Sequence, residues 1–98
     1  MDEDELMEDE MDEYEIYREL DRMLPAHVYR ESGEADVAAG EPDLGIEALL
    51  DAASMAGCLT DEIIQFIREQ FDDDSPVIEV LDALLVYEER ERAQNANP

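Results

Sequence analysis

The chain has no lysine, no tryptophan and only one cysteine, Cys58. A single thiol cannot close a disulfide within the chain, so the sequence predicts a reduced, cytoplasmic setting. No apolar run approaches the 18 residues that a membrane-spanning helix needs, and the acidic start lacks the basic and apolar regions of a signal peptide. At 98 residues, the chain has room for one small domain.

Positive charge is also scarce, because six arginines stand against 30 acidic residues and give a net charge of −24. Such a surface repels nucleic acids and anionic membranes and attracts basic protein surfaces. The sequence therefore predicts a basic protein as the partner, with no nucleic acid and no membrane. Two plainer explanations stay open: a lysine-free composition is typical of GC-rich genomes, and an acid-rich surface is typical of proteins adapted to high salt.

The sequence carries no recognisable catalytic or metal-binding motif. His27 is the only histidine and follows a predicted helix end, and Cys58 is surrounded by acids rather than by the positive charge that activates a thiol. The acidic run Asp72–Asp74 does not begin an EF-hand loop, because Val77 and Ala83 stand where Gly and Glu are required. We therefore predict a protein that is not an enzyme and that has no cofactor and no metal site.

Apolar residues make up 45% of the chain and recur at steps of three or four residues. This period is typical of amphipathic helices, and the alternation of a strand is absent. The predicted fold is all-α, a small antiparallel bundle of four to five helices. Residues 14–92 form the bundle, residues 93–98 a polar tail, and residues 1–13, with nine acids, a segment that is partly disordered or begins the first helix.

Local signals place the helix ends. Pro25 ends the first helix, and Ser32-Gly33 reads as a breaker pair. The triplet Gly40-Glu41-Pro42 reads as a helix start, and Thr60 and Ser75 read as N-caps. The predicted helices cover about residues 8–24, a short stretch within 26–39, 42–56, 61–71 and 76–92.

Three of these helices have a clear predicted apolar face. In the third helix, which Gly57 is predicted to end, the face consists of Ile46, Leu49, Leu50 and Ala53. In the fourth helix it is centred on Ile64, Ile67 and Phe71, with Ile63 and Phe66 at its sides. The stripe of the last helix consists of Val77, Val80, Leu81, Leu84, Leu85 and Tyr87.

The segment AAGEPDLGIEALLDAASMAGCLTDEIIQFIREQF, residues 38–71, resembles bacterial immunity proteins of the MafI type and their relatives in contact-dependent inhibition loci. Those proteins share a Gly-Glu-Pro-like start, a Leu- and Ala-rich helix that ends in a turn, and a following helix, with a small residue at the position of Gly45. The resemblance implies an all-helical cytoplasmic protein that neutralises a cognate toxin, often a nuclease. The first helix is longer and more acidic than in that family, and no toxin-contacting residue carries over.

The negative charge of the chain also favours a nuclease as the partner, independently of the resemblance. A nuclease presents a basic cleft to its substrate, and an acidic rigid bundle is steered rapidly to such a cleft. The other open readings are a nucleic-acid mimic that inhibits a DNA- or RNA-binding protein and a structural or adaptor domain whose acidity only solvates it. The predicted partner-binding residues are Asp72, Asp73, Asp74, Glu79 and Asp82, with Tyr14, Tyr17 and Tyr87 as exposed aromatic anchors.

Overall fold

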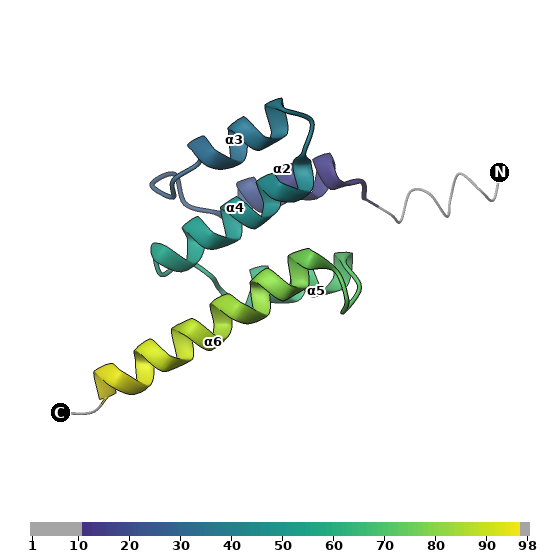
Figure 1. Ribbon diagram of the computed structural model, residues 1–98. Coiled ribbons are helices and arrows are strands. Elements are labelled where there is room, and N and C mark those ends of the chain that lie inside the picture. The colour runs from purple at the N-terminus through teal and green to yellow at the C-terminus, as the bar shows by residue number, and fades with distance from the viewer. Residues whose placement is uncertain (1–10, 97–98) are drawn as a thin grey trace.

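A computed structural model describes residues 11–96 of the chain, and within this range the protein is an all-helical bundle with no strand. Successive helices reverse direction along the chain (Figure 1). The predicted fold class is therefore confirmed. The helices are α2 (Glu13–Met23), α3 (Glu31–Ala38), α4 (Pro42–Met55), α5 (Asp61–Gln70) and α6 (Pro76–Ala96).

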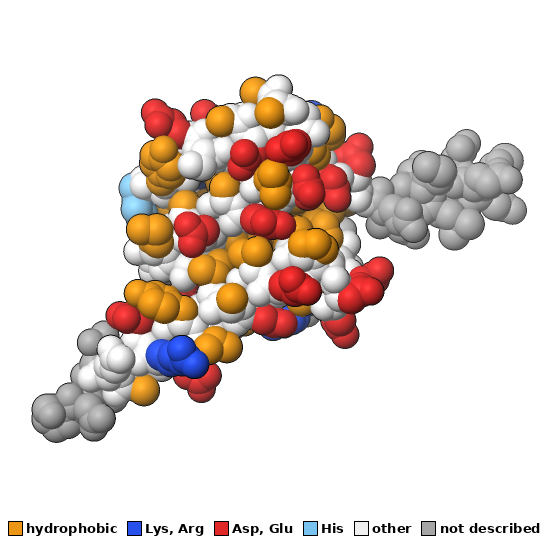
Figure 2. Space-filling model, viewed as in Figure 1, with side chains coloured by type: hydrophobic (Ala, Val, Ile, Leu, Met, Phe, Trp, Pro, Cys, Tyr) orange, Lys and Arg blue, Asp and Glu red, His pale blue; other side chains and the backbone are white. Residues whose placement is uncertain are grey.

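Helix α4 lies at the centre of the bundle and contacts α2, α3 and α6. Its predicted stripe, Ile46, Leu49, Leu50 and Ala53, is fully buried. Hydrophobic side chains gather along the seam between α4 and α6, with acidic side chains on both sides of it (Figure 2). The other buried apolar residues are Ile16, Tyr17, Leu20, Leu24, Val28, Ala52, Ile63, Ile67, Val77, Ile78 and Leu81.

The junction between α3 and α4 uses the predicted Gly-Glu-Pro triplet in two ways. Gly40 has φ +83°, and its N–H donates to the Val37 carbonyl while the Glu41 N–H donates to the Asp36 carbonyl. These are the bonds that close a helix, so Gly40 ends α3 rather than starting α4. Pro42 is the first residue of α4, as predicted.

Helix α3 confirms the short helix predicted within residues 26–39, but it includes the pair Ser32-Gly33 that was predicted to break it. Gly33 serves the packing of α3 against α4 and does not turn the chain. A Cβ added to Gly33 would lie 3.3 Å from the Gly45 carbonyl oxygen, and one added to Gly45 would lie 2.9 Å from Val37 Cγ2. The two glycines therefore let α3 and α4 approach closely.

Helix α2 begins later than predicted. Asp12 Oδ1 accepts a 2.8 Å hydrogen bond from the Glu15 N–H, and Glu15 Oε1 accepts a 3.0 Å bond from the Asp12 N–H. This reciprocal capping box fixes the first helical residue at Glu13, so residues 11 and 12 lie before the helix, while 8–10 lie outside the described residues. The predicted end before Pro25 is confirmed.

Helix α6 is longer than predicted. Its start is as expected, because Ser75 Oγ accepts a 3.1 Å hydrogen bond from the Val77 N–H and Pro76 is the first helical residue. It then continues through Ala96, so residues 93–96 are helical rather than part of a polar tail. The physical reason is that no glycine or proline interrupts the chain between Pro76 and Pro98.

The buried face of helix α5 includes Ile67, as predicted, but is shifted by one position, from Ile64 to Ile63. Thr60 caps it as expected, with Oγ1 accepting a 3.3 Å hydrogen bond from the Ile63 N–H. Ile63 and Ile67 are buried, whereas Ile64 and Phe71 are only half-buried. Because α5 contacts both α2 and α6, its buried face is centred on the Ile63–Ile67 pair.

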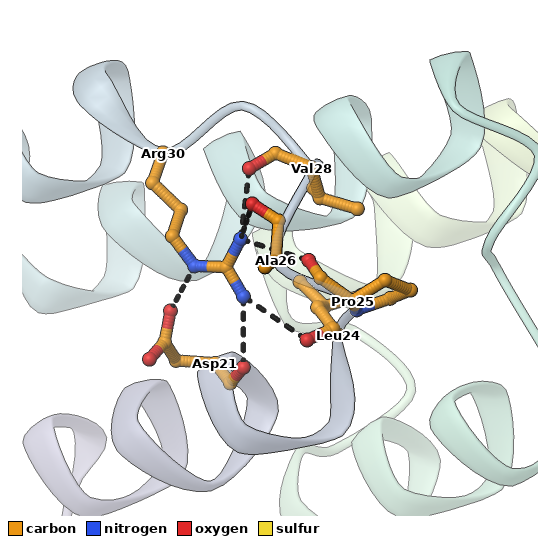
Figure 3. Close-up of polar contacts among 6 residues, drawn as sticks. All are labelled: Asp21, Leu24, Pro25, Ala26, Val28 and Arg30. Atoms are coloured by element: carbon orange, nitrogen blue, oxygen red, sulfur yellow. Dashed lines mark hydrogen bonds and ion pairs between the residues drawn. The ribbon is translucent and has the colours of Figure 1, made fainter.

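The turn between α2 and α3 is held by one arginine. The guanidinium of Arg30 donates to the carboxylate of Asp21 at 2.5 Å and to the carbonyl oxygens of Asp21, Leu24, Pro25, Ala26 and Val28 at 2.8–3.5 Å (Figure 3). These carbonyls belong to the end of α2 and the turn after it, where a helix leaves its acceptors without partners. A single side chain therefore supplies donors to the Asp21 carbonyl in the last turn of α2 and to the carbonyls of the turn that follows the helix.

Candidate protein-interaction surface

The acidic turn predicted as a partner contact lies between α5 and α6. Asp72, Asp73 and Asp74 are all exposed, and the Asp72 carbonyl accepts a 2.9 Å hydrogen bond from the Ser75 N–H. The backbone turn thus ends in the cap of α6. The structure brings the three carboxylates together at the start of that helix, with their side chains in solvent.

The two predicted acids on α6 differ in their surroundings. Glu79 is exposed in the first turn of the helix. Asp82 is also exposed, but its Oδ1 accepts a 2.8 Å hydrogen bond from Arg68 Nη2 on α5. An exposed ion pair of this kind contributes about 0.2–1 kcal/mol. It also partly neutralises Asp82, which makes that residue a weaker contact for a cation than Glu79.

Tyr17 is not the exposed anchor that the sequence predicts. Only 9% of it is exposed, and its ring lies against Gly33 and Gly45. Burial raises the pKa of its phenol, and the carboxylates of Asp21 and Glu34 raise it further. The prediction is wrong because two glycines distant in sequence create the space that the ring fills, so Tyr17 is a core residue.

The other two predicted anchors are exposed but lie on different helices. Tyr14 on α2 is 41% exposed and Tyr87 on α6 is 60% exposed. Tyr87 lines a concave surface, whereas Tyr14 is not among the residues that line it. The structure therefore does not bring the three tyrosines into one patch.

The concave surface is an open groove of about 1020 Å³ between the C-terminal parts of α4 and α6. We name it the α4–α6 groove. Its apolar part consists of Met55, Leu59, Leu84 and Tyr87, of which the two leucines are half-buried. The remaining lining residues are Asp51, Ser54, Gly57, Glu88, Glu91 and Arg92.

Two local features shape this groove. Gly57 has φ +73°, and the Cys58 N–H donates to the Ala53 carbonyl at 2.7 Å, which closes α4 and turns the chain away. The Ser54 hydroxyl donates a 2.6 Å hydrogen bond to Glu88 Oε2, which ties α4 to α6. The sequence-based prediction of Gly57 as the stop of this helix is confirmed, but the groove itself was not predicted.

Signals for the groove were nevertheless present in the sequence. Met55 lies off the buried stripe of its helix and is 83% exposed. Tyr87, at the end of the predicted stripe of the last helix, is 60% exposed. Large apolar residues on the solvent side of two helices mark a surface for contact when they lie together. Only the fold shows that Met55 and Tyr87 line the same groove.

Cys58 and His27 are neighbours in space, with 3.8 Å between Sγ and Nε2. Cys58 is half-buried and His27 is exposed in the turn after α2. Among residues 11–96, no group of three or more histidine, cysteine, aspartate or glutamate side chains is arranged to hold a metal ion. The pair therefore has no third ligand in the described part of the chain.

Negative charge dominates the described surface. Seven of the 30 acidic residues fall within residues 1–10, so 23 acids stand against six arginines in the part that the structure describes. Arg22, Arg30 and Arg68 form ion pairs with acids of the same chain. The repulsion is also visible at Glu47, whose pKa is raised by burial first and then by Asp43 and Asp36.

No protein-family model matches the chain, and neither the curated proteins nor the solved structures contain a significant match to it. The resemblance of residues 38–71 to immunity proteins therefore stays a prediction. None of the helices formed by residues 11–96 is long and apolar enough to cross a membrane.

Proposed function

We propose that this chain is a non-catalytic, cytoplasmic inhibitor that binds and neutralises a basic partner protein. The observation that carries this proposal is the excess of acids, 23 against six arginines, on a folded helical frame. An acidic surface of this kind increases the rate of encounter with a basic protein, up to about 10⁸–10⁹ M⁻¹ s⁻¹ at low salt. A folded frame also limits the entropy that is lost on binding.

The proposed partner is a nuclease-type toxin. A nuclease must expose a basic cleft to its substrate, and a carboxylate-rich surface competes with phosphates for that cleft. The resemblance of residues 38–71 to immunity proteins supports the same class of partner. The acidic turn Asp72–Asp74 and Glu79 are the proposed charged contacts, because they are exposed and lie at one end of α6.

The test begins with affinity capture by the immobilised chain from a lysate of its own cells at 50 mM salt, followed by identification of the retained proteins. The expected result is a basic nuclease whose affinity for the chain falls steeply between 50 and 500 mM salt and whose activity is inhibited. Retention of a basic DNA-binding protein without nuclease activity would favour the nucleic-acid mimic instead. If no basic protein is retained, the proposal is wrong.

A charge-matched pair of variants then locates the contact. One variant carries Asp72→Asn, Asp73→Asn and Asp74→Asn. The control loses the same charge at exposed acids elsewhere, by Glu34→Gln, Glu62→Gln and Glu89→Gln. Both variants are expected to keep the wild-type circular-dichroism melt, but the first is expected to weaken binding at least tenfold more than the control. Equal losses would assign the binding to overall charge rather than to the turn.

A further inference from the structure

We infer that the α4–α6 groove seats one large apolar side chain of a cationic segment of the partner, flanked by arginine or lysine. This inference rests on the proposed function and deepens it, because charge accounts for the rate of encounter and the class of partner but not for which basic protein is bound. Specific binding requires a few well-packed anchors surrounded by polar groups. The groove has an apolar part that can receive such an anchor and polar groups that surround it.

The apolar part of the groove is suited to an anchor. Leu59 and Leu84 are half-buried, while Met55 and Tyr87 are 83% and 60% exposed. Methionine adapts its shape to the surface it meets, and tyrosine offers a large ring at a small loss of conformational entropy. A side chain that enters the groove would therefore cover apolar surface that now faces water.

The rim of the groove selects the charge of the occupant. Asp51, Glu88 and Glu91 stand around the apolar part, and Arg92 is the one cation among the residues that line it. Acidic side chains beside the hydrophobic seam are visible in Figure 2. A cationic segment therefore finds an oppositely charged rim, whereas a second copy of this chain, with a net charge of −24, would be repelled.

The groove is preorganised by contacts of the chain itself. The 2.6 Å hydrogen bond between Ser54 and Glu88 fixes α4 against α6, and the left-handed Gly57 fixes the turn at one end. Binding to such a surface requires little further ordering of the protein. The rim carboxylate of Glu88 is held in place before a partner arrives.

The groove is also distinct from the acidic turn. Glu88 follows Pro76, the first residue of α6, by 12 residues, which corresponds to about 18 Å along the helix. Variants of the turn and of the groove therefore change separate features. An experiment can distinguish a general electrostatic attraction from an apolar anchor.

The direct test compares two fluorescein-labelled 12-residue peptides by fluorescence anisotropy at 50 mM salt. Both contain five arginines, but one has a central tryptophan where the other has serine. The tryptophan peptide is expected to bind the wild-type chain about tenfold more tightly. This gain should disappear in the Met55→Ser, Tyr87→Ser double variant and persist in Tyr29→Ser, which removes a 58% exposed tyrosine that does not line the groove.

The alternative outcomes separate the two proposals. Equal binding of both peptides to the wild-type chain would overturn the groove inference and leave the electrostatic function standing. Binding of neither peptide would contradict the electrostatic function itself. Amide chemical shifts locate the binding site independently. Addition of the tryptophan peptide should change the amide chemical shifts of Met55, Leu84 and Tyr87. Shifts at these residues on concentrating the chain alone would assign the groove to a second copy and overturn the inference.

Discussion

Ser54 on α4 donates a 2.6 Å hydrogen bond to Glu88 on α6, and so joins two helices whose residues are 34 positions apart. Ser54→Ala removes the donor and leaves a part-buried carboxylate with one partner fewer. We expect this change to lower the free energy of unfolding by about 1–2 kcal/mol, measured by urea denaturation. Glu88→Gln keeps an acceptor oxygen for Ser54 and should cost less. An unchanged urea midpoint for Ser54→Ala would show that the Ser54–Glu88 hydrogen bond does not stabilise the packing of α4 against α6.

Arg30 is expected to be the most important charged residue for stability. Arg30→Lys keeps the charge but cannot reproduce six hydrogen bonds from one planar group. We expect a loss of about 2–3 kcal/mol in chemical denaturation, because carbonyls at the end of α2 lose their donor. The control is Arg22→Lys, which alters an exposed pair with Glu19 and should change stability by less than about 0.5 kcal/mol. Similar losses in the two variants would contradict the assigned role of Arg30.

Gly45 is expected to be intolerant of a methyl group. Its added Cβ would meet Val37 Cγ2 at 2.9 Å and the Gly33 carbonyl at 3.1 Å. Gly45→Ala should therefore destabilise the fold by about 1–3 kcal/mol, despite the higher helix propensity of alanine. The double variant Gly45→Ala, Val37→Ala should recover part of the loss in thermal denaturation. A higher melting temperature for Gly45→Ala alone would show that α3 and α4 are less closely packed than described.

Glu47 should make stability depend on pH in an unusual direction for a carboxylate. Burial, Asp43 and Asp36 raise its pKa in the folded state above the ordinary value of 4.5. Between the raised pKa of the folded state and the ordinary pKa of the unfolded state, the folded state binds more protons than the unfolded state. The free energy of unfolding should therefore rise as pH falls through this window.

Glu47→Gln should consequently increase stability at pH 7 and reduce the gain on acidification, as measured by urea denaturation at a series of pH values. Glu62→Gln is the control, since it removes one negative charge from an exposed position on α5. If both variants show the same pH dependence, the effect belongs to the net charge rather than to Glu47.

The features predicted correctly from the sequence depend on residues close together in the chain. Pro42, Thr60 and Ser75 place the starts of α4, α5 and α6 because a cap acts on backbone groups within its own first turn. The buried stripe of α4 was also predicted, because Ile46, Leu49, Leu50 and Ala53 recur at helical spacing within one short segment. The acidic turn at Asp72–Asp74 is exposed for the same local reason, as a charged loop between two capped helices.

The missed features depend on residues far apart in the chain. The spacing of Tyr17, Leu20 and Leu24 places Tyr17 on one helical face with two buried leucines, but the space that its ring fills is set by Gly33 and Gly45 on two other helices, which no local pattern relates to it. The groove requires Met55 and Tyr87 to line one concave surface. The capping box at Asp12 is local, but it lies within a run of acids in which any of several residues could serve as the cap.

The most direct measurement is the salt dependence of affinity between the purified chain and the basic protein it captures from its own cells, by calorimetric titration at 50, 150 and 500 mM salt. We expect the dissociation constant to rise at least a hundredfold over this range, with the loss reduced in the variant that lacks the three carboxylates of Asp72–Asp74. A dissociation constant that stays the same at all three salt concentrations would contradict electrostatic recognition of a basic partner.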